Sequence, residues 1–523
     1  MSDVTREGEQ IGGAVNERTR KSAFNFVTGL AGTAVTLAVS FVTTPLLLRF
    51  LGTEVFGAVR ATTDWFGHLT LLELGLYGAL APLLAMALGR GDKERARATL
   101  AEGIRAYAKV ALAACLAGLV ITVMIERLVP VSPDLVRDLR IGCLIAVLGL
   151  CVYPLTPFRA LADASQRGWL INAGSLIQTL VVTGLAVLLA WEGFGIAGQF
   201  AALIVGQALF TLLLARDGVR RLPGLAAAVR QGRDAQTRAQ IRRLNLPSFL
   251  FDLSGRAGLM TDNIVIALVL GPTMVVPLFL TQRLLTLAQA QLQGIGNASW
   301  AALGELHALG RRDVFNARLI ELTGLVSALG VSVLLPLAAF DHAFVRLWVG
   351  ESRYGGELVN ILAAVNALLL SIVSLWGWCF TGTGQVTALV PVCLAGATLN
   401  LGLSVAGAFA IGLPGPLLGT AIATLSTTFW YMPYQMEKRF GASAARLFRA
   451  TLAPLAWAAI PGAGIVWLAL NHPPRSWPML AVDLAVSGTT LLLVWWIFEL
   501  RVEERAHYTS RLSMALPGRR TDA

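Results

Sequence analysis

Charged residues are scarce in this chain of 523 residues: they make up 14% of it, whereas hydrophobic residues make up 55%. A soluble globular protein carries charge at about 25% of its positions, so the composition argues against a soluble enzyme or binding domain. The alternating apolar and polar segments of a membrane β-barrel are also missing. Several uncharged runs instead approach or exceed the roughly 20 residues that a helix needs to cross a bilayer. We therefore expect an all-α, polytopic membrane protein.

Cysteine is scarce as well, and its positions argue against two kinds of site. All 5 cysteines fall within apolar runs and none forms a CxxC pair, so neither a disulfide framework nor a zinc site is expected. No nucleotide-binding, metal-ligand or nucleophile–base pattern occurs either. We therefore predict no enzyme activity, no cofactor and no bound metal. The net charge of +11 does not indicate a nucleic-acid partner, because Lys and Arg lie mainly in loops.

The apolar runs predict about fourteen membrane spans joined by short loops. The longest outer loop is expected at 340–357, and the longest inner loop, 216–245, holds eight arginines. The expected spans are at about 24–48, 61–88, 106–125, 141–158, 170–191, 196–215, 247–270, 273–300, 319–339, 358–380, 389–411, 417–436, 450–470 and 480–498.

Lys and Arg are distributed unevenly between the two sides of this predicted topology. The N-terminal tail, the even-numbered loops and the C-terminal tail hold 31 of them, whereas the odd-numbered loops hold 8. Because positively charged loops remain in the cytoplasm, we expect both termini to be cytoplasmic.

The two halves of the chain share short motifs at a nearly constant separation. Leu51-Gly52 matches Leu270-Gly271 at an offset of 219 residues, and Ala87–Asp92 matches Ala308–Asp313 at 221. Further pairs are Ser165-Gln166 with Gly384-Gln385, and Gly195 and Gly198 with Gly415 and Gly419. A repeat of six spans implies two parallel bundles with a binding site between them. The expected organisation is an N-terminal tail (1–23), a six-helix bundle (24–215), an Arg-rich linker (216–246), a second six-helix bundle (247–436), an extra helix pair (437–498) and a C-terminal tail (499–523).

Two arginines inside predicted spans mark the candidate binding site. A charge near the bilayer centre costs roughly 2.5–3.5 kcal/mol, so such residues usually face a polar cavity. Arg256 and Arg283 lie about midway along adjacent spans, and guanidinium groups bind phosphate oxygens in a bidentate way. The alternative for Arg256 is a structural ion pair with Asp252, one helical turn earlier.

Three carboxylates inside or near the ends of predicted spans are candidates for coupling or gating. Glu73 lies near the middle of its span, and Asp64 lies nine residues earlier on the opposite helical face. Asp262 lies six residues after Arg256, roughly 9 Å toward the outer side. The alternatives are a fixed interhelical salt bridge for Glu73 and contact with interfacial water for Asp64.

Seven short motifs occur in order along nearly the whole chain, and they carry a resemblance to a known family. They are LG-x3-FG (Leu51–Gly57), ELGL (Glu73–Leu76), ALGRGD (Ala87–Asp92), ASQRGWLIN (Ala164–Asn172), TDNIVIALVLG (Thr261–Gly271), QRLL (Gln282–Leu285) and LWVG (Leu347–Gly350). Together with six plus six spans and two appended spans, they resemble the Wzx-type polysaccharide flippases. These belong to the multidrug/oligosaccharidyl-lipid/polysaccharide exporter superfamily. Pro82 and Phe279 differ from the family pattern, in which an arginine and a tyrosine are common there.

The resemblance implies a function in surface polysaccharide (exopolysaccharide) biosynthesis. A flippase of this family moves an undecaprenyl-diphosphate-linked oligosaccharide from the cytoplasmic to the outer leaflet of the bacterial inner membrane by alternating access. The expected partners are this lipid-linked oligosaccharide, membrane lipids, a polysaccharide polymerase and glycosyltransferases. In this interpretation Arg256 and Arg283 bind the diphosphate.

Three other functions stay open at this point. A lipid II flippase also has fourteen spans, and the sequence does not distinguish its substrate. A cation-coupled multidrug exporter of the same superfamily usually has twelve spans and a cavity dominated by carboxylates, so the arginines argue against it. A membrane glycosyltransferase or polymerase is least favoured, because the expected outer loops are small.

Overall fold

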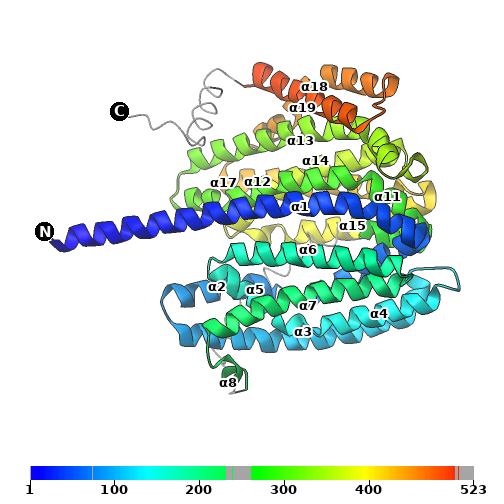
Figure 1. Ribbon diagram of the computed structural model, residues 1–523. Coiled ribbons are helices and arrows are strands. Elements are labelled where there is room, and N and C mark those ends of the chain that lie inside the picture. The colour runs from blue at the N-terminus through cyan, green and yellow to red at the C-terminus, as the bar shows by residue number, and fades with distance from the viewer. Residues whose placement is uncertain (1, 74, 231–237, 240–260, 501–504, 506–523) are drawn as a thin grey trace. The chain divides into compact units, whose positions relative to one another are not determined.

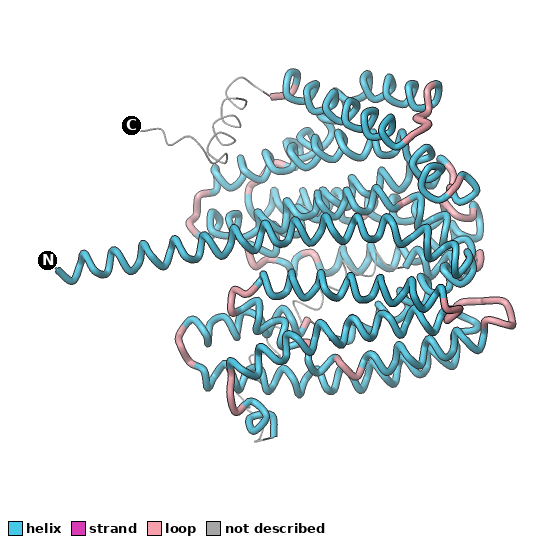
Figure 2. The backbone as a smooth tube through the Cα atoms, in the orientation of Figure 1, coloured by secondary structure: helices cyan, strands magenta, loops and turns pink. Residues whose placement is uncertain are grey.

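The computed structural model describes residues 2–73, 75–230, 238–239, 261–500 and 505, and every regular element in these ranges is a helix (Figures 1 and 2). Ten helical segments of this described part are long and apolar enough to cross a membrane. The expectation of an all-α, polytopic membrane protein is therefore confirmed. The chain divides into two compact units, Met1–Val276 and Pro277–Ala523.

The first unit is a bundle of packed helices. Within it, α3 packs against α4, α4 against α7, α7 against α6, α6 against α1, and α1 against α10, which also contacts α3. The elements are α1 (Ser2–His68), η1 (Leu69–Glu73), α2 (Leu76–Gly89), α3 (Lys93–Leu128), α4 (Val136–Leu150), η2 (Tyr153–Leu155), α5 (Pro157–Ala164), α6 (Gly168–Trp191), α7 (Ile196–Arg221), α8 (Leu225–Arg230), α10 (Thr261–Val269) and η3 (Pro272–Met274).

The second unit has its own pattern of neighbours, in which α13 is central. This helix contacts α12, α14, α18 and α19, and α14 also contacts α16, which packs on α15. The elements that follow η3 are α11 (Val275–Thr281), α12 (Arg283–Ala308), α13 (Arg312–Val349), η4 (Glu351–Arg353), α14 (Glu357–Gly382), η5 (Val386–Ala388), α15 (Val390–Ile411), α16 (Gly415–Ser426), α17 (Thr428–Phe440), α18 (Ala444–Asn471) and α19 (Trp477–Phe498).

Five expected spans are not single long helices in the described part of the chain. The span at 141–158 is shared by α4, η2 and the start of α5. The span at 61–88 is shared by the end of α1, η1 and α2, with Gly75 at φ 73° in the break. The span at 273–300 is divided among η3, α11 and α12, and that at 417–436 between α16 and α17. Of the span at 247–270, the first fourteen positions lie outside the described residues. The total of fourteen spans therefore stays a prediction.

The turns at corresponding places of the two repeat copies have the same backbone conformation. Gly52 has φ 77° and ψ 172°, and Gly271 has φ 92° and ψ 158°, a region that is essentially restricted to glycine. One span later, Gly91 (φ 72°) corresponds to Gly310 (φ 69°), at the same separation as the first pair. The same set of backbone hydrogen bonds closes these two later turns. The structure supports the repeat. It pairs Gly91 with Gly310 at an offset of 219 residues, as for Gly52 and Gly271, and so corrects the offset of 221 expected for Ala87–Asp92.

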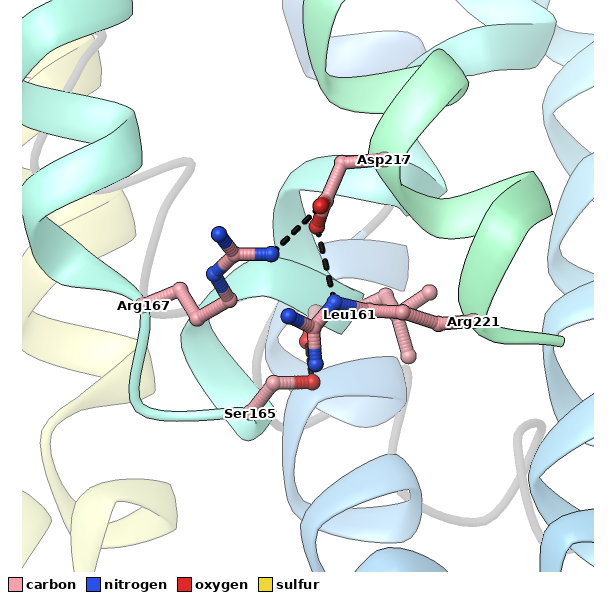
Figure 3. A network of polar contacts seen from close by, with 5 residues as sticks. All are labelled: Leu161, Ser165, Arg167, Asp217 and Arg221. Atoms are coloured by element: carbon pink, nitrogen blue, oxygen red, sulfur yellow. Dashed lines mark hydrogen bonds and ion pairs between the residues drawn. The ribbon is translucent and has the colours of Figure 1, made fainter.

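The turn between α5 and α6 is stabilised by ion pairs at the end of α7 (Figure 3). Gln166 has φ 56° there, which is uncommon for a residue other than glycine. By its backbone it corresponds to Gly384 (φ 71°), which corrects by one residue the pairing of Gln166 with Gln385 expected from the sequence. The guanidinium of Arg167 pairs with the carboxylate of Asp217, which also accepts from Nε of Arg221 at 3.0 Å. The turn is thereby attached to α7, which compensates for its unfavourable backbone.

The start of the linker between the two bundles is attached to α3. Arg105 donates from Nη1 to the backbone carbonyls of Ala228 (3.0 Å) and Val229 (2.9 Å) at the end of α8. Glu102, which is 5% exposed, pairs with Nη2 of Arg105 at 2.9 Å and so balances its charge. Because a cation interacts favourably with the carbonyl end of a helix, Arg105 holds α8 in place.

Candidate functional site

Of the two arginines of the predicted binding site, only Arg283 lies within the described residues. Arg256 and its expected partner Asp252 lie outside the described residues. Arg283 is the first residue of α12, half-buried, and its guanidinium carbon lies 5.4 Å from the centre of the Phe279 ring. Phe279 is four residues earlier, in α11. A cation–π contact of this kind orients the guanidinium while leaving its positive charge in place.

Asp64 of α1 lies against the beginning of α10. Its Oδ2 accepts a hydrogen bond from Nδ2 of Asn263 at 2.7 Å, and Arg60, one helical turn earlier, also acts on it electrostatically. The neighbouring Asp262 has a buried Oδ1 that has no hydrogen-bond partner within the described residues. The structure therefore brings together two of the predicted coupling or gating residues, Asp64 and Asp262, where α1 packs against α10.

A glycine allows α1 and the turn after α10 to approach this closely. A Cβ atom on Gly57 would lie 1.9 Å from the backbone oxygen of Pro272, so no larger residue fits without displacing the turn. Gly57 is the last residue of the LG-x3-FG motif, and Pro272 follows Gly271 of the second copy. The motif is thus explained by a contact between α1 and η3.

Glu73 has a different partner from the other two carboxylates. It ends η1, and its Oε2 accepts a hydrogen bond from the hydroxyl of Tyr107 in α3 at 3.2 Å. The break in the helix at Gly75 follows directly. Glu73, which is half-buried, is therefore held against α3 beside the hydrophobic core of the first unit, to which the fully buried Tyr107 belongs.

The sequence-based prediction missed a polar group that involves Tyr77 of α2, just after Glu73 in the chain. The hydroxyl of Tyr77 in α2 donates to the carboxylate of Asp163 in α5, and the guanidinium carbon of Arg159 lies 5.9 Å from the Tyr77 ring centre. The predicted fourth span ended at residue 158, so Arg159 was assigned to an inner loop. Pro157 begins α5 instead, and the four-residue spacing of Arg159 and Asp163 places both on one helical face.

Arg60 was missed for a similar reason. The prediction placed it in the first outer loop, but the chain turns already at Gly52, and Arg60 lies on the helical part of α1 that follows. Arg60 and Asp64 are four residues apart and share a face. At the offset that relates Gly52 to Gly271, the position of Asp64 corresponds to that of Arg283, so equivalent places of the two copies carry opposite charges.

The described helices thus carry guanidinium groups, carboxylates and tyrosine hydroxyls at positions where lipid-facing residues would be apolar. Guanidinium groups bind phosphate oxygens, and hydroxyl and carboxylate groups bind the hydroxyls of sugars.

Comparisons with known proteins agree with this architecture. No family model matches the chain. It is 22% identical over 495 residues to the uncharacterized membrane protein EpsK of Bacillus subtilis, a match that covers 91% of this chain and 94% of EpsK. Among solved structures, lipid II flippase MurJ in an inward closed conformation has a TM-score of 0.68 at 12% identity, covering 93% of this chain and 100% of MurJ.

Multidrug transporters of the MATE family are also similar in structure, over a smaller part of the chain. An inward-facing MATE transporter of the MOP superfamily has a TM-score of 0.57 at 16% identity, covering 79% of this chain and 98% of its own. The Vibrio cholerae MATE transporter VcmN has a TM-score of 0.57 at 15% identity, covering 83% of this chain and 99% of its own. The protein therefore has the polytopic membrane fold of the MurJ and MATE transporters.

Proposed function

We propose that this protein is a flippase that moves an undecaprenyl-diphosphate-linked oligosaccharide from the cytoplasmic to the outer leaflet, for surface polysaccharide biosynthesis. The observation that carries the proposal is the length of the structural match. The match to MurJ covers 93% of this chain, whereas the matches to the two MATE transporters cover 79% and 83% of it. The motifs of the polysaccharide flippases, spread over nearly the whole sequence, support the same choice.

The proposed headgroup site uses guanidinium groups from predicted spans of this chain. Arg283 and Arg256 bind the diphosphate, because a guanidinium fork matches phosphate oxygens and remains charged when it is desolvated. Arg159 and Tyr77 of the first unit add a second place where a sugar or phosphate can bind. The lipid tail stays in the bilayer, so the site has to accommodate only the polar headgroup.

Alternating access is the proposed mechanism, with the two six-span copies as moving parts joined by the 216–246 linker. Asp64 and Asp262 act in gating, since the Asp64–Asn263 hydrogen bond joins a helix of the first copy to a helix of the second. Glu73 acts in coupling through Tyr107. Both termini face the cytoplasm of a bacterial cell, and glycosyltransferases and a polymerase supply and use the substrate.

Lipid II is the second candidate substrate, because the MurJ structure that matches this chain is that of a lipid II flippase. The two substrates share a lipid diphosphate and differ in the sugars and peptide. Depletion of the protein separates the two: loss of surface polysaccharide in viable cells supports the polysaccharide substrate, whereas lysis during growth supports lipid II.

Arg283→Ala tests the proposed site directly. We expect it to reduce flipping of a fluorescent undecaprenyl-diphosphate-linked sugar in proteoliposomes by about tenfold or more, because a charge-assisted hydrogen bond contributes about 1.5–3 kcal/mol. Arg283→Lys should restore part of the rate. Arg475→Ala removes an exposed arginine from the loop between α18 and α19 and serves as the control. A wild-type rate for Arg283→Ala would remove Arg283 from the site.

A further inference from the structure

A fully buried carboxylate lies in α13 of the second unit. Asp341 is 0% exposed, and neither of its carboxyl oxygens has a hydrogen-bond partner among the described residues. An isolated charge in an apolar interior is very costly, so such a carboxylate has to be neutralised. The sequence-based topology placed Asp341 in the outer loop 340–357, whereas the structure continues α13 as far as Val349.

The groups around Asp341 supply further oxygen atoms. Asn360 of α14 donates from Nδ2 to the backbone carbonyl of Ala338 at 2.7 Å, one turn before Asp341, while its buried Oδ1 accepts no hydrogen bond within the described part. Glu357, at the start of α14, is close enough to act electrostatically on Asp341. Asp341, Asn360 and Glu357 therefore bring carboxylate and amide oxygens together between α13 and α14.

Tyr354, in the loop between η4 and α14, adds a hydroxyl to the same group. Burial, Glu357 and Asp341, in that order, raise the pKa of this phenol, and its oxygen is buried. A raised pKa means that Tyr354 stays a neutral phenol over the physiological range. It can contribute a neutral oxygen to a bound cation or donate a hydrogen bond to a carboxylate.

A cavity of about 180 Å³ lies beside this group, and its lining includes Phe340 and His342, the two chain neighbours of Asp341. It lies among α13, α14 and α18, and both the exposed Glu357 and the buried Asn360 line it. The two basic side chains that line it have other partners: Arg346 donates to the carbonyl of Pro474 at 2.9 Å, and Nε2 of His342 lies 3.5 Å from the carboxylate of Glu351. Neither of them neutralises Asp341.

We infer that Asp341, Asn360, Tyr354 and Glu357 form a site for one small monovalent cation, a proton or a sodium ion. Asp341 carries the compensating charge, Asn360 and Tyr354 provide neutral oxygens, and Glu357 stands at the mouth of the cavity. Hard cations take oxygen ligands of these kinds. The cavity admits water and a small ion, while its apolar walls from α13 and α18 exclude larger charged ligands. The site goes beyond the proposed function, since its occupancy does not depend on which lipid is moved.

The test measures cation binding on the purified full-length protein in detergent. Saturable binding of radioactive sodium at neutral pH, at about one ion per chain, is expected for a sodium site. A carboxylic-acid infrared band that disappears as the pH rises, without sodium binding, is expected for a proton site. Asp341→Asn should abolish whichever signal the wild type gives, and Glu351→Gln should keep it. Glu351 is a suitable control because its side chain is 68% exposed and lies just beyond the end of α13.

Two outcomes would overturn the inference: neither signal in the wild type, or an unchanged signal in Asp341→Asn. The elution volume on gel filtration shows whether Asp341→Asn is folded. If it is not, Tyr354→Phe and Glu357→Gln take its place, and each should weaken sodium binding or shift the titration by about tenfold in concentration. Wild-type binding by both of these variants would equally contradict the site. Because binding is measured without a lipid substrate, a failed flipping assay leaves this result unaffected.

Discussion

The charged side chains inside the helices are of two kinds. Some are satisfied by neighbours in the structure: Asp64 accepts from Asn263 at 2.7 Å, and Glu73 accepts from Tyr107 at 3.2 Å. Others keep unused binding capacity, as Asp341 does with both carboxyl oxygens within the described residues. The first kind stabilises one arrangement of helices, whereas the second kind has capacity for a further contact. Asp262, which is proposed for gating, is of the second kind too, since its buried Oδ1 has no hydrogen-bond partner within the described residues.

The Asp64–Asn263 hydrogen bond should be measurable as a coupling energy. Asp64→Ala and Asn263→Ala each remove the same charge-assisted bond, which contributes about 1.5–3 kcal/mol. We therefore expect each single variant to lower the thermal unfolding midpoint of the purified protein. The double variant should be no less stable than the poorer single variant, because the bond can be lost only once. Strictly additive losses would contradict a direct interaction between these side chains.

At the scale of elements, the turns that divide the helices recur in both copies. Gly52 and Gly271 share a backbone region that other residues avoid, and Gly57 allows α1 to contact the turn at Pro272. The LG-x3-FG motif is explained by these two requirements, since its first glycine bends the chain and its second permits close packing. Motif residues of this kind determine where helices end and how closely they pack.

Gly52→Ala should destabilise the protein although no atom blocks the new methyl group. No heavy atom lies within 4 Å of a Cβ at Gly52, so the cost is backbone strain, about 1–3 kcal/mol. We expect a lower thermal midpoint by tryptophan fluorescence, and a similar effect for Gly271→Ala. Gly32→Ala is the matched control, because Gly32 lies in the helical part of α1 with equally open surroundings and a normal backbone. Its substitution should be neutral or slightly stabilising. Equal midpoints for all three variants would contradict the strain.

At the scale of the whole molecule, hydropathy and the charge asymmetry define a multi-pass chain, and each of its two compact units has its own core. The first unit packs Tyr107 and Phe158 among the residues of α2, α3, α5 and α7, and the second packs Trp376 and Phe380 among α12, α13, α14 and α17. Apolar residues form both these cores and much of the exposed surface. The candidate functional positions were therefore chosen by their polar groups and not by their burial.

The proposed flipping of a dianionic headgroup should respond to membrane potential. Moving one elementary charge outward from a negative-inside cell is favoured by roughly 2.3 kcal/mol per 100 mV. In proteoliposomes with equal pH and equal sodium on both sides, a potassium diffusion potential should accelerate flipping toward the positive side. Vesicles with Arg283→Ala are the control for leakage of the lipid. A rate independent of the potential would mean that the charge is compensated during transport, or that the substrate is not dianionic.

The sequence predicts the parts of this protein that depend on local composition. Apolar runs define most spans, because the transfer of an apolar helix into lipid depends mainly on its own residues. Glycine pairs such as Gly52 and Gly271 reveal the repeat, because their backbone requirement is local too. The offset predicted for Ala87–Asp92 was wrong, because it came from aligning identical residue types. The structure instead pairs Gly91 with Gly310, the glycines at which the chain turns.

Only the tertiary structure decided which charged residues are near one another. Arg159 and Arg60 were assigned to loops and Asp341 to an outer loop, because polar residues lower the hydropathy at a span end. The helices continue through them, since backbone hydrogen bonds are local. Neighbouring helices bury Asp341, whereas Arg60 is half-buried and Arg159 is exposed. The pairing of Asp64 with Asn263 joins residues that are 199 positions apart, and no local pattern encodes such a contact. Composition thus determined that the chain is a membrane protein built of helices, and packing determined where its charges meet.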